Sequence, residues 1–141
     1  NVKWVWSPNH LSFPNESWNE ASDYYPGSAY VDWIGIDGYN WGFGDWFTFD
    51  EIYSSSYATF STYGKPIMIG EFASAEDGGD KAAWITSTFL TIKNDYPQIR
   101  AFNWFNINKE RDWRINSSSS AEAAFKTAVS DSYFLDSRPT E

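Results

Sequence analysis

Four short stretches of the chain are rich in β-branched, aromatic and other apolar residues, as buried strands are. They cover residues 2–6, 31–36, 66–70 and 99–105. The third stretch, P-I-M-I-G, is almost wholly apolar, which favours a strand that is covered on both faces, as in a parallel sheet. The pattern therefore predicts four parallel strands.

Segments with a helical spacing of apolar residues separate these strands. Three of them are well marked, and they cover residues 50–63, 80–96 and 121–129, with a weaker one at 16–24. The first stops at Gly64 and the second before Pro97, residues that commonly end helices, and the serines at 117–120 suit the start of the third. Alternating strands and helices predict βα units around a parallel sheet.

Aromatic residues are the main peculiarity of the composition. They make up 21% of the chain, with 9 Trp and 9 Tyr, and many fall in the long polar segments after the strands, at 7–15, 38–48, 72–79 and 106–116. In βα architectures ligands bind beyond the carboxyl ends of the strands. Aromatic rings there favour a ligand with apolar faces and polar edges, such as a sugar. An aromatic-rich core is the alternative.

Charge and cysteine content exclude several classes of function. The formal net charge is -9, which argues against binding to nucleic acid or to an anionic membrane. The chain has no Cys, hence no disulfide, thiolate metal site or Cys nucleophile. No apolar run approaches the roughly 18 residues of a membrane span. We expect neither a metal nor a cofactor.

Glu71 is the sharpest candidate for chemistry. It follows P-I-M-I-G directly, so we expect it at the carboxyl tip of a buried strand. A carboxylate there is costly unless it is paired, hydrogen-bonded or solvated in a site. A structural salt bridge to Lys65 or Arg100 is the alternative. Retaining glycosidases use one carboxylate as the nucleophile and a second carboxyl group as the acid.

No other carboxylate has the surroundings expected of a general acid. Asp37 ends the second predicted strand, where it suits binding a sugar hydroxyl or orienting Tyr39. The remaining acidic residues of the loops are expected to be solvated, as for Glu76 and Asp77, or ion-paired with Arg111 and Arg114, as for Glu110 and Asp112.

Five sequence blocks together resemble glycoside hydrolase family 26. They are W-S-P-N at 6–9, Y-Y-P-G at 24–27, V-D-W-I-G-I-D-G-Y-N at 31–40, K-P-I-M-I-G-E-F at 65–72 and W-F-N at 104–106. The family contains β-mannanases and some β-1,3-1,4-glucanases. The resemblance implies a (β/α)8 TIM barrel and a retaining mechanism, with residues 1–141 as a single C-terminal half barrel that holds strands five to eight.

The resemblance also implies roles for individual residues. Glu71 matches the catalytic nucleophile, Tyr39 matches a tyrosine that donates a hydrogen bond to it, and Trp104 matches the aromatic platform under the sugar. Further substrate-binding positions are expected at Trp6, Asn9, Asp37, Trp41 and Trp46. Loop packing is an equal alternative for Trp41 and Trp46, and Trp33 is expected in the core.

One departure from the family pattern shapes the functional prediction. The family's acid/base Glu lies in an H-E-M-N-like motif, and the only histidine here, His10, is not in such a motif. We therefore expect the chain to pair with an N-terminal half barrel or with itself. The predicted function is a secreted retaining endo-β-glycanase, with β-1,4-mannan as the first substrate and mixed-linkage β-glucan as the second. The alternatives are a catalytically incomplete, polysaccharide-binding half barrel and a fragment with no function of its own.

Overall fold

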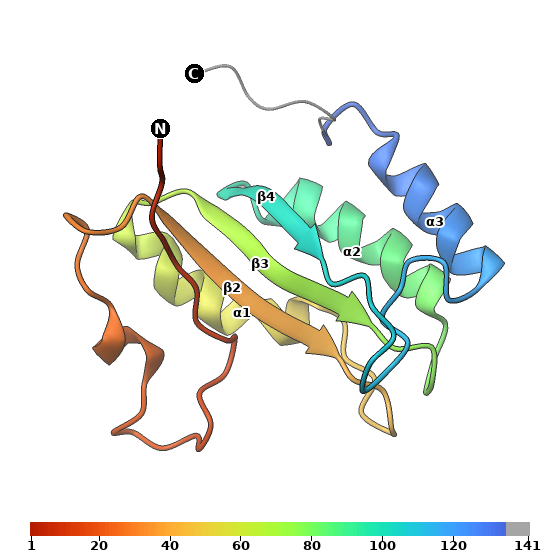
Figure 1. Cartoon of the computed structure of the whole chain (residues 1–141), viewed down its shortest axis with the longest axis horizontal. Helices are drawn as coiled ribbons and strands as arrows, with labels where there is room; N and C mark the ends of the chain where they lie inside the picture. The colour runs from red at the N-terminus through yellow and green to blue at the C-terminus, as the bar shows by residue number, and fades with distance from the viewer. Residues whose placement is uncertain (135–141) are drawn as a thin grey trace.

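The computed structural model describes residues 1–134. They form a parallel sheet with helices on one side. The strands are β1 (Val5–Trp6), β2 (Trp33–Asn40), β3 (Ile67–Ser74) and β4 (Ile99–Trp104), and they lie side by side in sequence order. All three pairings are parallel (Figure 1). The predicted α/β architecture with four parallel strands is confirmed, as an open sheet and not as a closed barrel.

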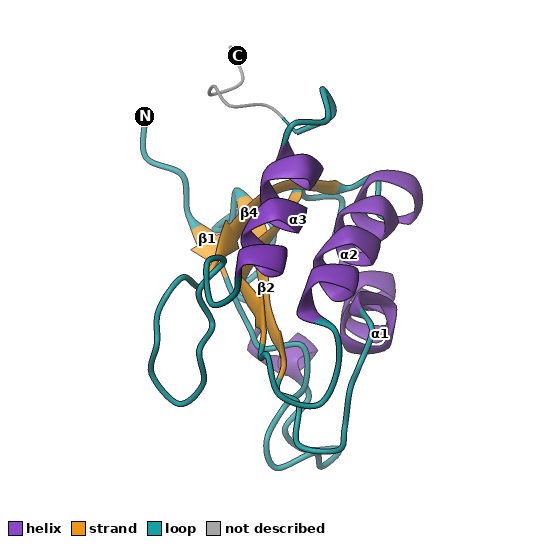
Figure 2. Ribbon diagram, turned by 90° about the vertical axis from the view of Figure 1, so that its right-hand side faces the viewer, coloured by secondary structure: helices purple, strands orange, loops and turns teal. Residues whose placement is uncertain are grey.

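Helices connect the strands and cover a single face of the sheet. They are α1 (Phe49–Phe60), α2 (Lys81–Asp95) and α3 (Ser119–Val129), with 3-10 turns η1 (Ala21–Tyr24) and η2 (Ser61–Tyr63). Figure 2 shows α1, α2 and α3 together on that side. Within residues 1–134, no helix combines the length and the apolar character that crossing a membrane requires.

Local side-chain contacts explain where the helices begin. The Thr48 hydroxyl and the Glu51 carboxylate each bind the other's backbone N–H, forming a capping box at the start of α1. Asp80 and Ser118 cap α2 and α3 in the same manner, each accepting from a backbone N–H three residues on. The helix predicted from residue 50 thus begins one residue earlier, at Phe49, because Thr48 is the cap.

The two faces of the sheet differ in cover. Apolar side chains of β2 and β3 meet those of α1 and α2 in one core, which includes Ile34, Ile36, Ile67, Ile69, Phe72, Ile52, Tyr53, Phe89 and Ile92. No described helix covers the other face, which we call the open face. It carries Trp33, Asp37 and Tyr39 of β2 and Met68 and Glu71 of β3, none of them fully buried. The expectation of strands buried on both faces, and of Trp33 in the core, is wrong for this chain.

The strands differ from the predicted ones mainly at their ends. Residues 38–40 and 72–74 were expected in loops, yet they continue β2 and β3. The buried Asn40 side chain donates to Ser74 Oγ at 2.9 Å, so polar residues extend the sheet where the apolar run has ended. At the other extreme, β1 is only two residues long, and the weak helix predicted at 16–24 is a single 3-10 turn.

Candidate active site

A β-bulge in β3 sets the direction of Glu71. Ile69 pairs with Ile36 on β2, but Glu71 pairs with Asp37, so β3 has one residue more than β2 over this interval. The extra residue is Gly70. A bulge breaks the strict alternation of side chains and can re-aim one of them. Here it places Glu71 opposite Asp37 on the open face, while Phe72 returns to the core.

Tyr39 binds the Glu71 carboxylate directly. The Tyr39 hydroxyl donates a hydrogen bond to Glu71 Oε2. Burial, followed by the hydrogen bond and the charge of Glu71, raises the pKa of Tyr39 far above its ordinary value, so the phenol keeps its proton and remains a donor. The contact predicted between Tyr39 and Glu71 is present in the structure.

The Glu71 side chain is exposed and has no basic partner. In the described part of the chain no ion pair includes Glu71. Lys65 instead donates to the backbone oxygen of Ser28 at 2.7 Å. The structural salt bridge that was the alternative interpretation of Glu71 is therefore not formed.

Asp37 is the second carboxylate of the open face. Its Oδ1 accepts from Ser7 Oγ at 3.2 Å, and its carboxylate also accepts from the backbone N–H of Glu71. Burial raises the pKa of Asp37, and the charge of Glu71 raises it further. A Cβ on Gly70 would lie 2.3 Å from Asp37 Oδ1, so glycine leaves the space that Asp37 fills. Asn9 bridges to Asp37 through the backbone at the edge of this group.

Aromatic rings surround Tyr39. The Trp41 ring lies 5.9 Å from Tyr39 and 5.0 Å from Trp113, between ring centroids, and Phe105 meets Tyr39 edge-on. Trp41 is 48% exposed and Trp113 only 1%, so Trp113 supports the group from behind. Neither Trp113 nor Phe105 was predicted as part of the site. Trp113 lies in the loop after the fourth strand, where ligands were expected, whereas Phe105 was expected within the strand.

Three of the expected aromatic contacts lie elsewhere. The Trp104 ring packs against Phe72, Trp84 and Phe125 on the helix side of the sheet. Trp6 packs edge-on against Tyr25 and Phe60, and Trp46 lies against Gly78 and Gly79. As substrate contacts, Trp104, Trp6 and Trp46 stay predictions that their positions do not support. For Trp46 the alternative of loop packing is present.

The loop carboxylates take part in structural contacts. Asp112 pairs with Arg114 at 2.6 Å, Glu110 with Lys109 at 2.9 Å and Asp77 with Arg111 at 3.4 Å. Glu76, which was expected to be solvated, accepts from Ser117 Oγ at 2.5 Å. Asp77 is exposed, as expected, and Asp112 is paired with Arg114, as expected. Glu110 is paired with Lys109 and not with an arginine.

A buried lysine fixes the loop that follows β4. Lys81 Nζ donates to the backbone oxygens of Asp112 and Arg114 and to Ser117 Oγ, at 3.0, 2.8 and 2.8 Å. Burial lowers the pKa of Lys81 to about 8, although Glu76 and Asp112 oppose that shift. Lys81 therefore holds the loop at the residues on either side of Trp113.

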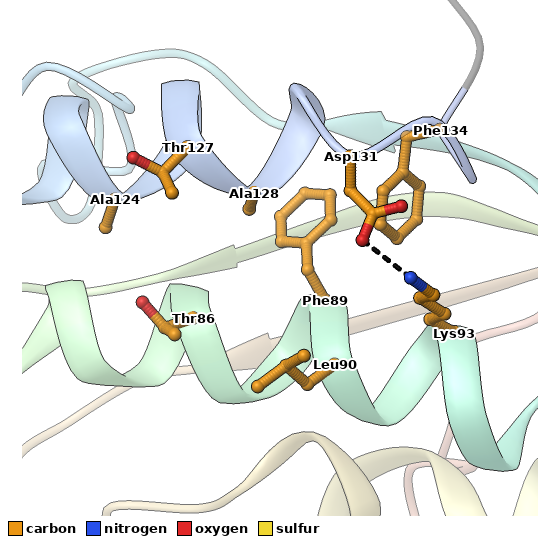
Figure 3. Close-up of a pocket in the computed structure, with 9 residues that line it drawn as sticks. All are labelled: Thr86, Phe89, Leu90, Lys93, Ala124, Thr127, Ala128, Asp131 and Phe134. Atoms are coloured by element: carbon orange, nitrogen blue, oxygen red, sulfur yellow. Dashed lines mark hydrogen bonds and ion pairs between the residues drawn. The ribbon is translucent and has the colours of Figure 1, made fainter.

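Other parts of the described chain hold less chemistry. Residues 1–134 contain no cluster of three or more His, Cys, Asp or Glu side chains arranged to hold a metal ion. An apolar groove between α2 and α3, with the Lys93–Asp131 ion pair at one end, lies on the helix side of the sheet (Figure 3).

The open face combines a solvated carboxylate, a hydrogen-bond donor to it and an exposed aromatic ring. This set can attack an electrophilic carbon and hold a sugar ring beside it.

Comparison with known sequences finds a family and a relative of this chain. A model of glycosyl hydrolase family 26 matches residues 1–135. Endoglucanase H of Acetivibrio thermocellus is 46% identical over 134 residues, which cover 92% of this chain and 15% of that protein.

Solved structures with the same fold are glycosidases of larger size. A mannanase of Bacillus subtilis superposes with a TM-score of 0.58 at 23% identity, over 89% of this chain and 32% of the mannanase. An endo-β-1,3-glucanase of family GH128 from Amycolatopsis mediterranei gives a TM-score of 0.51 at 19% identity, over 70% of this chain and 45% of the glucanase. The chain therefore spans less than half of each relative.

Proposed function

Because this chain belongs to glycosyl hydrolase family 26, we propose that it supplies the nucleophile half of a retaining endo-β-glycanase. Glu71 is the proposed nucleophile. The observation that carries the proposal is the Glu71 carboxylate itself, which is exposed on the open face, free of any described basic partner and bound by the Tyr39 hydroxyl. A nucleophile has to be accessible and held in one direction, and the exposure of Glu71 and its hydrogen bond from Tyr39 support both conditions.

The geometry supports the following course for the reaction. Glu71 attacks the anomeric carbon, the bond from that carbon to the leaving oxygen breaks, and a glycosyl ester forms on Glu71. A carboxyl group about 5–5.5 Å from the nucleophile protonates the leaving oxygen and later activates water. Asp37 is the described carboxylate nearest in the sheet, but it is bound by Ser7 and by the Glu71 backbone. We therefore assign the acid to a part of the barrel outside these four strands.

The proposed substrate is a β-linked plant polysaccharide. The sequence favoured β-1,4-mannan first and mixed-linkage β-glucan second. The 46%-identical relative is named an endoglucanase, whereas the mannanase resembles this chain at 23% identity and supports the fold alone. We therefore place the β-glucan first. Since a polysaccharide of this size does not cross a membrane, we also propose that the domain works outside the cell.

A reactive glycoside tests the nucleophile without the missing acid. The dinitrophenolate group of a dinitrophenyl 2-deoxy-2-fluoro-β-cellobioside leaves without being protonated. This substrate therefore needs only the attacking carboxylate. We expect intact-mass and peptide mass spectrometry to find one fluorocellobiosyl group on Glu71. Glu71→Gln should remain unlabelled, and Glu122→Gln, which removes a carboxylate from α3, should label as the parent does. Labelling at another residue, or none in the parent, contradicts the nucleophile assignment.

A second candidate is a binding module that holds polysaccharide without cutting it. The exposed Trp41 ring beside Tyr39 favours it, because such a ring can stack on sugar without any acid. Affinity electrophoresis in gels that contain barley β-glucan or galactomannan separates the two candidates. Retardation of the chain, together with no label on Glu71, would favour the binding module.

A further inference from the structure

Tyr53 of α1 reaches the sheet directly behind Glu71. Its hydroxyl lies 3.0 Å from the backbone oxygen of Gly38 on β2 and 3.2 Å from the backbone oxygen of Glu71 on β3. The side chain is fully buried, and its burial keeps the phenol protonated by raising its pKa. One hydroxyl proton is therefore shared between two adjacent strands at the position of the nucleophile.

The bulge explains why a side chain is needed there. The pairing of β3 with both neighbours is irregular at the same place, since Gly70 is unpaired against β2 and the register with β4 shifts between Ile69 and Phe72. Backbone oxygens at a bulge lose regular ladder partners, and a buried oxygen without a partner is costly. Tyr53 binds the Glu71 oxygen from the helix side, and Asn103 Nδ2 binds the Gly70 oxygen from the open face at 3.3 Å.

Packing gives Tyr53 a single position. Its ring stacks on Phe49, with 4.4 Å between centroids and 18° between planes. A Cβ on Gly38 would lie 3.0 Å from the Tyr53 oxygen and 2.7 Å from Ile52, so the hydroxyl reaches the sheet because residue 38 is glycine. The contact is thus built by residues of two elements, and the reaction proposed above does not itself use Tyr53.

We propose that Tyr53 and Asn103 are positioning residues, which fix the bulge and so aim Glu71 at the sugar. The role in aiming rests on the proposed function, whereas the effect on the bulge does not. Both residues act through backbone oxygens of residues 70 and 71, one from each face of the sheet. A displacement of a reacting atom by about 1 Å can cost roughly a hundredfold in rate, so loss of either contact should be visible in the reaction of Glu71.

The test compares two buried tyrosines that each lose only a hydroxyl. Tyr53→Phe removes the bond to the bulge. Tyr96→Phe is the matched control, because the buried Tyr96 hydroxyl donates to the Asp50 side chain of α1, at 2.5 Å, and not to a backbone oxygen of the sheet. We expect both variants to lower Tm by a similar amount, about 3–6 °C. Only Tyr53→Phe should slow labelling of Glu71 by the fluorocellobioside, by about ten- to a hundredfold.

A second readout needs no reaction at all. The hydroxyl proton of Tyr39, which is bound to Glu71, can be followed by NMR in tyrosine-labelled protein and assigned with Tyr39→Phe. We expect this resonance to shift or broaden in Tyr53→Phe and to keep its place in Tyr96→Phe. Asn103→Ala removes the contact from the solvent side and leaves the core intact, so it replaces Tyr53→Phe where that variant does not fold. We expect it to give the same change in the Tyr39 resonance.

The two readouts separate this proposal from the function. An unlabelled parent chain would contradict the nucleophile assignment, and the Tyr39 resonance would still decide the role of the bulge contacts. An unchanged Tyr39 resonance in Tyr53→Phe, or in Asn103→Ala where that variant replaces it, overturns the proposal. Equal labelling rates in Tyr53→Phe and Tyr96→Phe overturn it as well, because a purely structural hydroxyl would act in that way.

Discussion

At the scale of single residues, two carboxylates share the open face and affect each other through charge. Asp37 and Glu71 are register partners on neighbouring strands. The pKa of Asp37 is raised first by burial and second by the negative charge of Glu71, while the Ser7 hydroxyl and the Glu71 backbone oppose the rise. Asp37 therefore reports on the charge of the proposed nucleophile.

Removing the charge of Glu71 should lower the pKa of Asp37. In Glu71→Gln the Coulombic cause is lost and burial remains, so we expect the pKa of Asp37 to fall while staying above its ordinary value. Carboxyl-carbon NMR titration of Asp37 measures this directly. Glu16→Gln, which removes a charge from an exposed loop, should leave Asp37 unchanged. An Asp37 titration that is the same in Glu71→Gln and in the parent contradicts the assignment.

The same variant should change how stability depends on pH. Between the ordinary and the raised pKa of Asp37, the folded chain holds a proton that the unfolded chain has released. Raising the pH through that window therefore costs stability, and the cost persists above it. In Glu71→Gln the pKa of Asp37 is raised less, so this cost in stability is smaller. The Tm of the variant minus the Tm of the parent should therefore be larger at pH 7 than at pH 3. Thermal unfolding at both values, with Glu16→Gln alongside, checks the sign.

At the scale of elements, the bulge of β3 is the feature on which the site depends. Gly70 is the extra residue, and it lies beneath Asp37 and Ser7 with no room for a side chain. A glycine there satisfies two needs at once, since it permits the irregular pairing and leaves space for the carboxylate of the neighbouring strand.

Gly70→Ala should displace Asp37 and destabilise the fold. The added Cβ would lie 2.3 Å from Asp37 Oδ1 and 2.6 Å from Ser7 Oγ, so the Ser7–Asp37 hydrogen bond has to open. We expect a loss of about 1–3 kcal/mol in the free energy of unfolding, the usual range for overpacking. Urea unfolding measures it. Gly64→Ala, where a Cβ meets no atom and only the positive φ of 68° opposes it, should cost less. No loss in Gly70→Ala would show that space at Gly70 does not matter.

Much of this arrangement was predictable from the sequence, and the rest failed for a definable reason. Apolar runs located β2, β3 and β4, and the D-G-Y-N and G-E-F motifs identified Asp37, Tyr39 and Glu71, which the structure brings together. The bulge was not predictable, because glycine tolerates it but does not require it.

The face of the sheet on which Trp104 lies depends on the pairing register of β4 with β3, which the sequence does not reveal. On a strand, side chains alternate between faces, so an error of one position moves a residue to the opposite face. Trp104 pairs with Phe72 and shares its side of the sheet, facing the helices. Phe105 lies one residue on and meets Tyr39 instead. Similarly, Trp113 could not be placed, because its position depends on the loop that Lys81 holds.

At the scale of the whole molecule, the open face of the sheet has no covering layer in the described residues, and the two edge strands have no outer partner. β1 and β4 each have a partner on one side only, and the described helices all cover the other face. Parallel sheets are normally covered on both faces, and unpaired edges invite another strand. We therefore propose that the open face associates with a second half barrel, or with another copy of this chain when no such half is present.

Self-association of the isolated chain should depend on the open face and should rise with salt. Apolar cover drives it, whereas the net charge of -9 opposes it by repulsion that salt screens. We expect sedimentation velocity to show a larger mass at higher protein concentration, more strongly in 300 mM than in about 10 mM NaCl, where screening extends over about 30 Å.

Charge placed at the centre of the open face should weaken that association. Met68→Lys puts an ammonium group where apolar contact is expected, and we expect the dissociation constant to rise at least about tenfold, the equivalent of 1.4 kcal/mol. Leu90→Lys is the matched control, because Leu90 is exposed on α2, on the opposite side of the sheet. A chain that stays monomeric at all concentrations would mean that the open face is tolerated in water. Weakening by Leu90→Lys alone would instead assign the contact to the helix side.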